Sequence, residues 1–328
     1  MNIFGLRLFL IFLTLLFSAG CGPTYPKERL AASIIELCRK EYGIKVESKV
    51  IGKTLAIYIP LPKLLDITMT VSMEAQDMIQ NVILSTSRVA LSTDAKIEFY
   101  CVIAQDMRMP EVQIVLIKYI DDVKRAYFSD ISRDEYFKRT LFDININPQS
   151  KKEKDLKNIF EKYDMDPELK EKVLDEFFRS TPLHLEDFGY WQGRFYVKDI
   201  TLPEFLAEQM AYRVKMRFRE NEKLSKKFLV KDIDGYYKDI SGKFFFYIYF
   251  DIKLNEILKV MGETYDKRDL FMNIFEEVSD CLYGYKFDNF SVVRITDKNN
   301  AVRLFISKED LYAFKKGKLG VDAIMGGL

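Results

Sequence analysis

The sequence predicts an α+β protein with two repeated α-β-β-α-β-β domains, whose sheets are mainly antiparallel, separated by a helical segment. The composition is globular, because 48% of the 328 residues are apolar, 30% are charged, and Gly and Pro are few. Helical stripes and strand-like runs follow one another in the same order four times along the chain. The turns are also evenly spaced. The number of residues from the turn at Gly52 to the turn at Met109 equals the number from the turn at Gly242 to the turn at Asn299.

The first domain is predicted over residues 28–128. Leu30, Ile34 and Cys38 recur with helical spacing, and the stripe stops at Gly43, a residue type that commonly ends helices. The elements predicted for this domain are a helix at 30–42, strands at 44–51 and 54–59, a short helical turn at 60–66, a helix at 78–89, strands at 96–104 and 111–118, and a helix at 121–128.

The second domain is predicted over residues 202–318. Leu206, Met210, Val214 and Phe218 recur every four residues, which indicates an amphipathic helix. The elements predicted for this domain are that helix from 202, strands at 228–237 and 243–250, a short helix at 254–261, a helix at 271–284, strands at 287–296 and 301–306, and a helix that begins at Ser307.

Residues 129–201 are predicted to form an insert or spacer. The charged stretch 150–179 has an apolar stripe and a second helix start at Asp166-Pro167, so it indicates a helical hairpin. Residues 188–200 could add a strand. Residues 319–328 are predicted to be a flexible tail.

The N-terminal segment has the pattern of an export signal. Arg7 and the amino terminus are basic, residues 8–17 are almost entirely apolar, and the small residues Ser18-Ala19-Gly20 lead into Cys21. A helix that crosses a bilayer needs about 20 apolar residues, and this run is shorter. The segment therefore predicts cleavage after export, and an ordinary secretory signal or an uncleaved anchor is the alternative.

Ser18-Ala19-Gly20-Cys21 resembles the lipobox of bacterial lipoproteins, a family that usually has Leu where this chain has Ser18. The resemblance covers the first 21 residues. It implies that residues 1–20 are removed as a signal peptide and that Cys21 carries acyl chains such as palmitate, which anchor the chain to a membrane of the cell envelope. Gly22 in place of Asp implies the periplasmic face of the outer membrane if the cell is Gram-negative. Residues 21–29 read as a short tether.

The charge balance argues against nucleic acid as a partner. Arg7 is the only charged side chain among residues 1–21, so the rest of the chain holds equal numbers of basic and acidic residues. The local exception is the run Tyr212–Arg219, in which Arg213, Lys215, Arg217 and Arg219 alternate with other residues. These four cations are the candidate contacts for anionic lipid or glycan phosphate, and a solvated basic flank of a helix is the simpler interpretation.

Catalytic and metal-binding patterns are sparse. His184 is the only histidine, Cys38, Cys101 and Cys281 are scattered among apolar positions, and neither set has zinc-site spacing. Asp232 and Asp234 precede a glycine and faintly resemble a calcium loop, but the glycine position favours a turn. Phosphate-loop, dinucleotide-loop and nucleophile-elbow motifs are absent. We therefore predict no metal, no cofactor and no catalytic residues.

Three classes of function remain open. The leading hypothesis is a membrane-anchored envelope lipoprotein that acts as a non-catalytic interaction or assembly module with envelope protein partners. The alternative is a binding protein for a small ligand or cell-wall glycan, with a cleft between the domains lined by Tyr residues or Trp191. The third is a hydrolase that uses a carboxylate pair.

Overall fold

The computed structural model describes residues 24–66, 70–109, 112–146, 198–255, 267–299 and 302–326. The chain divides into two compact units, of which the first is Met1–Ile114 with Asn145–Leu185 and the second is Val115–Ile144 with Glu186–Leu328. Outside the described residues lie the predicted signal segment with Cys21, the predicted hairpin at 150–179, His184, Trp191, most of the predicted strand at 188–200 and most of the predicted helix at 254–261.

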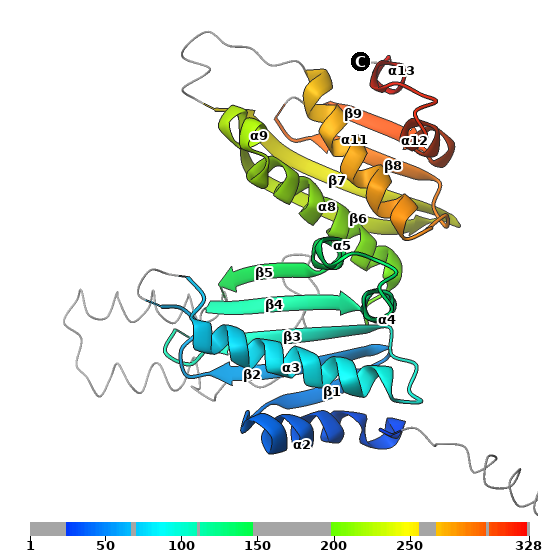
Figure 1. Cartoon of the computed structure of the whole chain (residues 1–328). Helices are drawn as coiled ribbons and strands as arrows, with labels where there is room; N and C mark the ends of the chain where they lie inside the picture. Colours follow the sequence, from blue (N-terminus) through cyan, green and yellow to red (C-terminus); the bar gives the residue numbers. More distant parts are fainter. Residues whose placement is uncertain are drawn as a thin grey trace, which may run out of the picture. The chain divides into compact units, whose positions relative to one another are not determined.

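The first sheet contains five strands within the described ranges (Figure 1). Their spatial order follows the sequence, from β1 to β5. β1 and β2 pair antiparallel, whereas β2 and β3 pair parallel. The first-sheet elements and their helices are η1 (Lys27–Arg29), α2 (Leu30–Tyr42), β1 (Glu47–Ile51), β2 (Thr54–Leu61), α3 (Met73–Leu91), β3 (Phe99–Asp106), β4 (Val112–Tyr119) and β5 (Leu141–Ile146).

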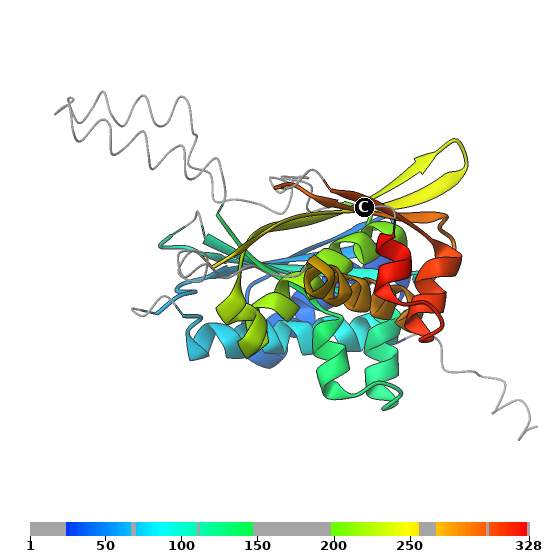
Figure 2. The same cartoon turned by 90° about the horizontal axis from the view of Figure 1, so that it is seen from above.

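Local chemistry sets the ends of these elements. Gly43 adopts a left-handed conformation, with φ of 68°, and ends α2 as the sequence predicts. The Ser72 side chain accepts a hydrogen bond from the Ala75 backbone and so caps α3. Every residue of β3 is buried, so both faces of the first sheet are withdrawn from solvent at that strand. α2 and α3 lie on one of those faces (Figures 1 and 2).

The second sheet has the order β6-β7-β8-β9. Its outer pairs are antiparallel, and the central pair of β7 and β8 is parallel. The elements of the second unit not yet named are α4 (Ile120–Tyr127), α5 (Arg133–Lys138), α8 (Leu202–Glu220), α9 (Glu222–Lys227), β6 (Phe228–Ile240), β7 (Lys243–Leu254), α11 (Lys267–Gly284), β8 (Val292–Asp297), β9 (Arg303–Ser307), α12 (Lys308–Lys315) and α13 (Val321–Met325).

The inner face of the second sheet packs against α8 and α11. Phe246, Ile248 and Phe250 alternate along β7 and are completely buried there. Gly235 of β6 lies so close to α8 that a Cβ atom at this position would overlap the carbonyl group of Ala207. In Figure 2 the helices α8, α11, α12 and α13 all lie on this side of the sheet. None of the described helices of the second unit covers the opposite, outer face.

The predicted fold class is confirmed, because the structure contains two similar α+β arrangements with mainly antiparallel sheets. The parallel central pairs follow from the repeat, since a helix crosses between the second and third strands of each set. The positions of the main helices and strands agree with the predicted ranges to within a few residues at most ends. The unit division assigns α4 to the second unit, whereas the sequence placed it at the end of the first domain.

The predicted helical turn at 60–66 is wrong. Pro60 and Leu61 continue β2, where they lie beside Gln105 and Asp106 of β3. The backbone amide of Leu64 then donates a 2.8 Å hydrogen bond to the Asp106 carboxylate. Because that carboxylate satisfies the donors of this turn, no helical hydrogen bonds are needed there.

Two other predictions were incomplete. The segment predicted as a spacer contributes α5 and strand β5, which is hydrogen-bonded to β4 at the edge of the first sheet. The segment predicted as a flexible tail contains the short helix α13, whose first residue, Val321, is buried.

In the part of the chain that the structure describes, no helix combines the length and apolar character needed to span a bilayer.

Candidate functional site

The four cations singled out on α8 do not share one exposed surface. The Arg213 side chain is only 7% exposed, and it donates a 2.9 Å hydrogen bond to Glu135 of α5. Arg217 contacts Asn273 and Glu276 of α11. Lys215 is half-buried and Arg219 is exposed. A helix turns about 100° per residue, so alternate residues point in widely different directions.

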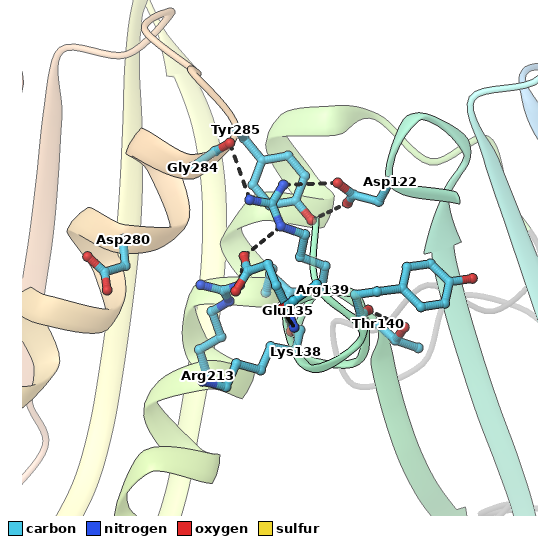
Figure 3. A network of polar contacts seen from close by, with 12 residues as sticks. Asp122, Glu135, Lys138, Arg139, Thr140, Arg213, Asp280, Gly284 and Tyr285 are labelled. Carbon is cyan, nitrogen blue, oxygen red and sulfur yellow. Dashed lines mark hydrogen bonds and ion pairs between the residues drawn. The ribbon is translucent and has the colours of Figure 1, made fainter. Parts of the chain in front are cut away.

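Arg213 belongs to a polar network inside the second unit (Figure 3). Arg139 lies at its centre and is only 5% exposed. Its guanidinium donates to Asp122 at 2.9 Å and to Glu135 at 2.6 Å, and it stacks 4.4 Å from the centre of the Tyr285 ring. The Tyr285 hydroxyl in turn donates a 2.6 Å hydrogen bond to Asp122.

The network is built to hold charges out of water. Burial raises the pKa of the Asp122 carboxyl, and the Tyr285 hydroxyl and Arg139 oppose that rise. Burial also acts to raise the pKa of Glu135, but Arg139 and Arg213 outweigh it and hold that pKa below its usual value. The two carboxylates face the two buried guanidinium groups, and the less buried Arg125 lies 3.7 Å from Asp122 as well. The network joins α4, α5, α8 and the end of α11, and this role is structural.

A groove of about 510 Å³ lies beside this network, between side chains of α5, α8 and α11. Phe137 and Tyr212 supply aromatic surface, and Arg213, Arg217 and Glu277 are among its charged residues. Burial raises the pKa of Glu277 against the attraction of the two arginines. The mixture of aromatic and oppositely charged groups suits a small polar ligand more than a simple anion.

The acidic motif around Gly235 has a structural explanation. The Lys298 ammonium donates to Asp232 and Asp234, each at 2.8 Å, and these bonds help to raise the pKa of Lys298 despite its partial burial. Asp239 accepts a 2.9 Å hydrogen bond from the Gly242 backbone in the β6–β7 turn. Within the described ranges, no three His, Cys, Asp or Glu side chains gather where they could hold a metal ion.

Three cysteines in the described ranges are free thiols with buried side chains, as predicted for small apolar core residues: Cys38, Cys101 and Cys281. Burial raises the pKa of Cys101 and of Cys281 to about 12, and it also raises that of Cys38. The thiolate form that reacts with electrophiles is therefore scarce at neutral pH.

The outer face of the second sheet carries the most distinctive arrangement in the structure. We define the outer face as the side-chain surface opposite α8 and α11, and its central row contains Tyr236, Tyr247, Arg294 and Phe305. These residues are direct partners across the four strands β6, β7, β8 and β9. Phe305 is 64% exposed, and the other three are partly exposed.

Aromatic rings extend the row on both sides along β7. The Tyr247 and Tyr249 rings are nearly parallel, with centres 6.3 Å apart, and Phe245 lies 6.4 Å from Tyr247. The Tyr236 ring meets Tyr249 edge to face at 5.9 Å. These rings stiffen one another, because such contacts contribute about 0.5–1.5 kcal/mol each. The result is an ordered aromatic surface.

Three cations accompany the rings on the outer face. The Arg294 guanidinium lies 5.8 Å from the centre of Tyr247 and 5.2 Å from that of Phe305. Lys238 of β6, across β7 from Arg294, lies 5.8 Å from the centre of the Tyr247 ring. Arg303 is an exposed neighbour of Phe305 on β9. Within the described ranges none of the three cations forms an ion pair with a carboxylate, and the buried Nε of Arg294 has no hydrogen-bond partner.

The sequence reasoning did not find this surface. The run Phe244–Ile252 is apolar at nearly every position, so it does not reveal which residues face the helices. The tyrosines at alternate positions 247 and 249 were a usable signal, because a Tyr hydroxyl favours a surface with access to water. The pairing of β7 with β8 and β9, which brings Arg294 between two rings, has no local signature.

Comparison of the chain with protein-family models, curated proteins and solved structures finds no match in any of the three. The function is therefore argued from the residues and geometry of this chain.

Proposed function

We propose that this protein is a lipid-anchored envelope lipoprotein that acts as a non-catalytic interaction module. Export, removal of residues 1–20 and acylation of Cys21 would hold the body at a membrane surface, and the lipobox-like sequence supports this part. The outer face would then present a binding surface to a protein partner in the same compartment.

The outer face is the single observation that carries the interaction role. Tyr, Phe and Arg are enriched at the cores of protein interfaces, and Tyr and Arg dominate the residues whose loss weakens binding most. Tyr247, Arg294 and Phe305 stand side by side on a face that none of the described helices of the same unit covers. An aromatic surface that contacts only water loses the stabilisation that burial would give it. Exposed apolar patches on proteins therefore commonly mark interaction sites.

The test is isolation of the full-length protein from membranes in mild detergent, with quantitative mass spectrometry of the proteins that accompany it. A variant with both Tyr247→Ser and Phe305→Ser removes aromatic area from the outer face, and Arg219→Glu on α8 is the control. We expect the same envelope proteins to accompany the wild type and the control but not the double variant. Absence of any reproducible partner for the wild type would contradict the proposal.

A second candidate function is binding of a small polar ligand in the groove between α5, α8 and α11. Its volume of about 510 Å³ falls within the range of ligand sites, and Arg213 and Glu277 offer charges of both signs. The sequence placed such a ligand between the domains, whereas this groove is lined by residues of the second unit alone. Thermal stabilisation by a metabolite, lost in a Tyr212→Ala variant, would favour this function.

A further inference from the structure

We propose that the partner of the outer face is an acidic protein surface, whose carboxylates pair with Arg294, Arg303 and Lys238 while its apolar groups cover the tyrosine rings. This inference rests on the proposed interaction function and specifies the chemistry of the partner. It follows from the cations that have no ion pair among the described residues, from the position of Arg294 between two rings, and from the hydrogen bonds of the neighbouring acids.

The first argument is charge complementarity. Salt bridges hold many charged side chains of this chain, both buried and exposed, yet the three cations of the outer face have no carboxylate partner among the described residues. Covering them with an apolar or basic partner would remove them from water without compensation, which is costly. A partner that brings carboxylates avoids that cost and also associates faster.

The second argument is the preorganisation of Arg294. Its guanidinium is held between Tyr247 and Phe305 by contacts to both rings, at 5.8 Å and 5.2 Å. An arginine already ordered in this way loses little side-chain entropy on binding. A guanidinium can also bind a carboxylate through two parallel hydrogen bonds, so it selects this group by geometry as well as by charge. Arg294 is therefore the expected centre of the contact.

The third argument concerns a second copy of this chain. The acids of the outer face lie in the cross-strand row that contains Arg303 and in the row beyond it. They are already engaged, since Asp232 and Asp234 share Lys298, and Asp251 accepts a 2.7 Å hydrogen bond from Asn299. A second copy facing the first would therefore offer the three cations no unengaged carboxylate from this part of the sheet. The complementary groups are better supplied by a different protein.

The test uses the full-length protein in its own membranes, with the photoreactive amino acid benzoylphenylalanine at position 305. Irradiation should give a protease-sensitive adduct, and mass spectrometry should place the crosslink beside Asp or Glu residues of the partner. Arg294→Glu should lower the adduct yield by about tenfold or more, as expected for the centre of an interface. Arg303→Glu should lower it by a smaller factor, and Arg219→Glu should leave it unchanged.

Ionic strength gives a second readout. Raising the salt concentration of isolated membranes from about 0.05 M to about 0.5 M should reduce the adduct several-fold, because exposed charge pairs are screened. A circular dichroism spectrum and melting temperature equal to those of the wild type would show that Arg294→Glu is folded. The milder Arg294→Gln variant should give an intermediate yield.

The other occupants are distinguishable outcomes. A protease-resistant adduct to lipid or glycan, or an adduct to a second copy of the chain, would overturn the inference. A protein adduct that Arg294→Glu leaves unchanged would overturn it as well, while the proposed interaction function would survive. If benzoylphenylalanine at 305 and at the exposed control positions Tyr127 and Phe137 yields no protein adduct, the proposed function itself fails.

Discussion

Replacement of Asp122 by Asn tests whether the buried network holds the second unit together. Asp122 is 4% exposed and accepts hydrogen bonds from Arg139 at 2.9 Å and from Tyr285 at 2.6 Å. The substitution keeps the size of the side chain and one acceptor for Tyr285, but it removes the charge. Arg139 and Arg213 would then share the single carboxylate of Glu135.

The expected cost follows from this imbalance. Breaking a buried ion pair by removing one partner destabilises a protein by about 3–5 kcal/mol, because the other charge stays buried and uncompensated. Since Glu135 still contacts Arg139, we expect the lower end, about 3 kcal/mol. That is a large part of the total stability of a domain, which is about 5–15 kcal/mol.

Asp121→Asn is a matched control on the same helix. Asp121 also lies in the first turn of α4, so both substitutions lose the same favourable interaction with the helix dipole. Its ion pair with Lys124 is about half exposed, and such pairs contribute about 0–1 kcal/mol. The difference between the two variants therefore isolates the buried network.

The assay is urea unfolding of the full-length chain followed by circular dichroism, combined with hydrogen exchange of α11. With an m-value of about 2 kcal/mol/M, Asp122→Asn should lower the midpoint of the second unit by about 1.5 M. Exchange of the α11 amides should accelerate in Asp122→Asn and remain near the wild-type rate in Asp121→Asn. Equal shifts in both variants would refute the reasoning.

Three further predictions concern the core. Gly235→Ala should lower the free energy of unfolding by about 1–3 kcal/mol in urea titrations, because its Cβ would overlap a carbonyl group of α8; an unchanged midpoint would show that the helix can shift. Burial lowers the pKa of Lys118 to about 7, so between that value and the usual 10.5 the unfolded chain binds the extra proton and stability should rise with pH. The slope should stay below about 1.4 kcal/mol per pH unit, because only one proton is involved. The Tyr136 ring 3.8 Å away favours the ammonium form and so narrows this pH window, and Lys118→Met should abolish the contribution. Maleimide should label Cys101 and Cys281 only after unfolding; rapid labelling of the native protein would contradict their burial.

Most of the fold could be predicted because the repeat is encoded locally. Helix stops such as Gly43, caps such as Ser307 and the turn at Gly242 act within a few residues, and all three are found where the sequence placed them. The short helix predicted at 60–66 failed because its backbone donors bind Asp106, which lies about 40 residues further along the chain. A local pattern carries no information about such a partner.

The functional surface was harder to predict than the fold. The alternation of Arg213 with apolar residues indicated a surface cation. In the structure Arg213 is buried and donates a hydrogen bond to Glu135 of α5. No sequence pattern marks Arg294, although strand pairing places it between Tyr247 and Phe305. In both cases residues on other elements decide the role of a charge. Sequence periodicity does not contain that information.

The most direct test of the account is the intact mass of the protein purified from membranes, measured beside a Cys21→Ala variant. We predict that the native form begins at Cys21 and carries added acyl mass, and that the variant keeps residues 1–20 and has no acyl mass. Such a result would show that the protein is lipid-anchored, in a compartment where envelope partners can reach the outer face. A native form that is cleaved without lipid, or not cleaved, would contradict the lipoprotein proposal.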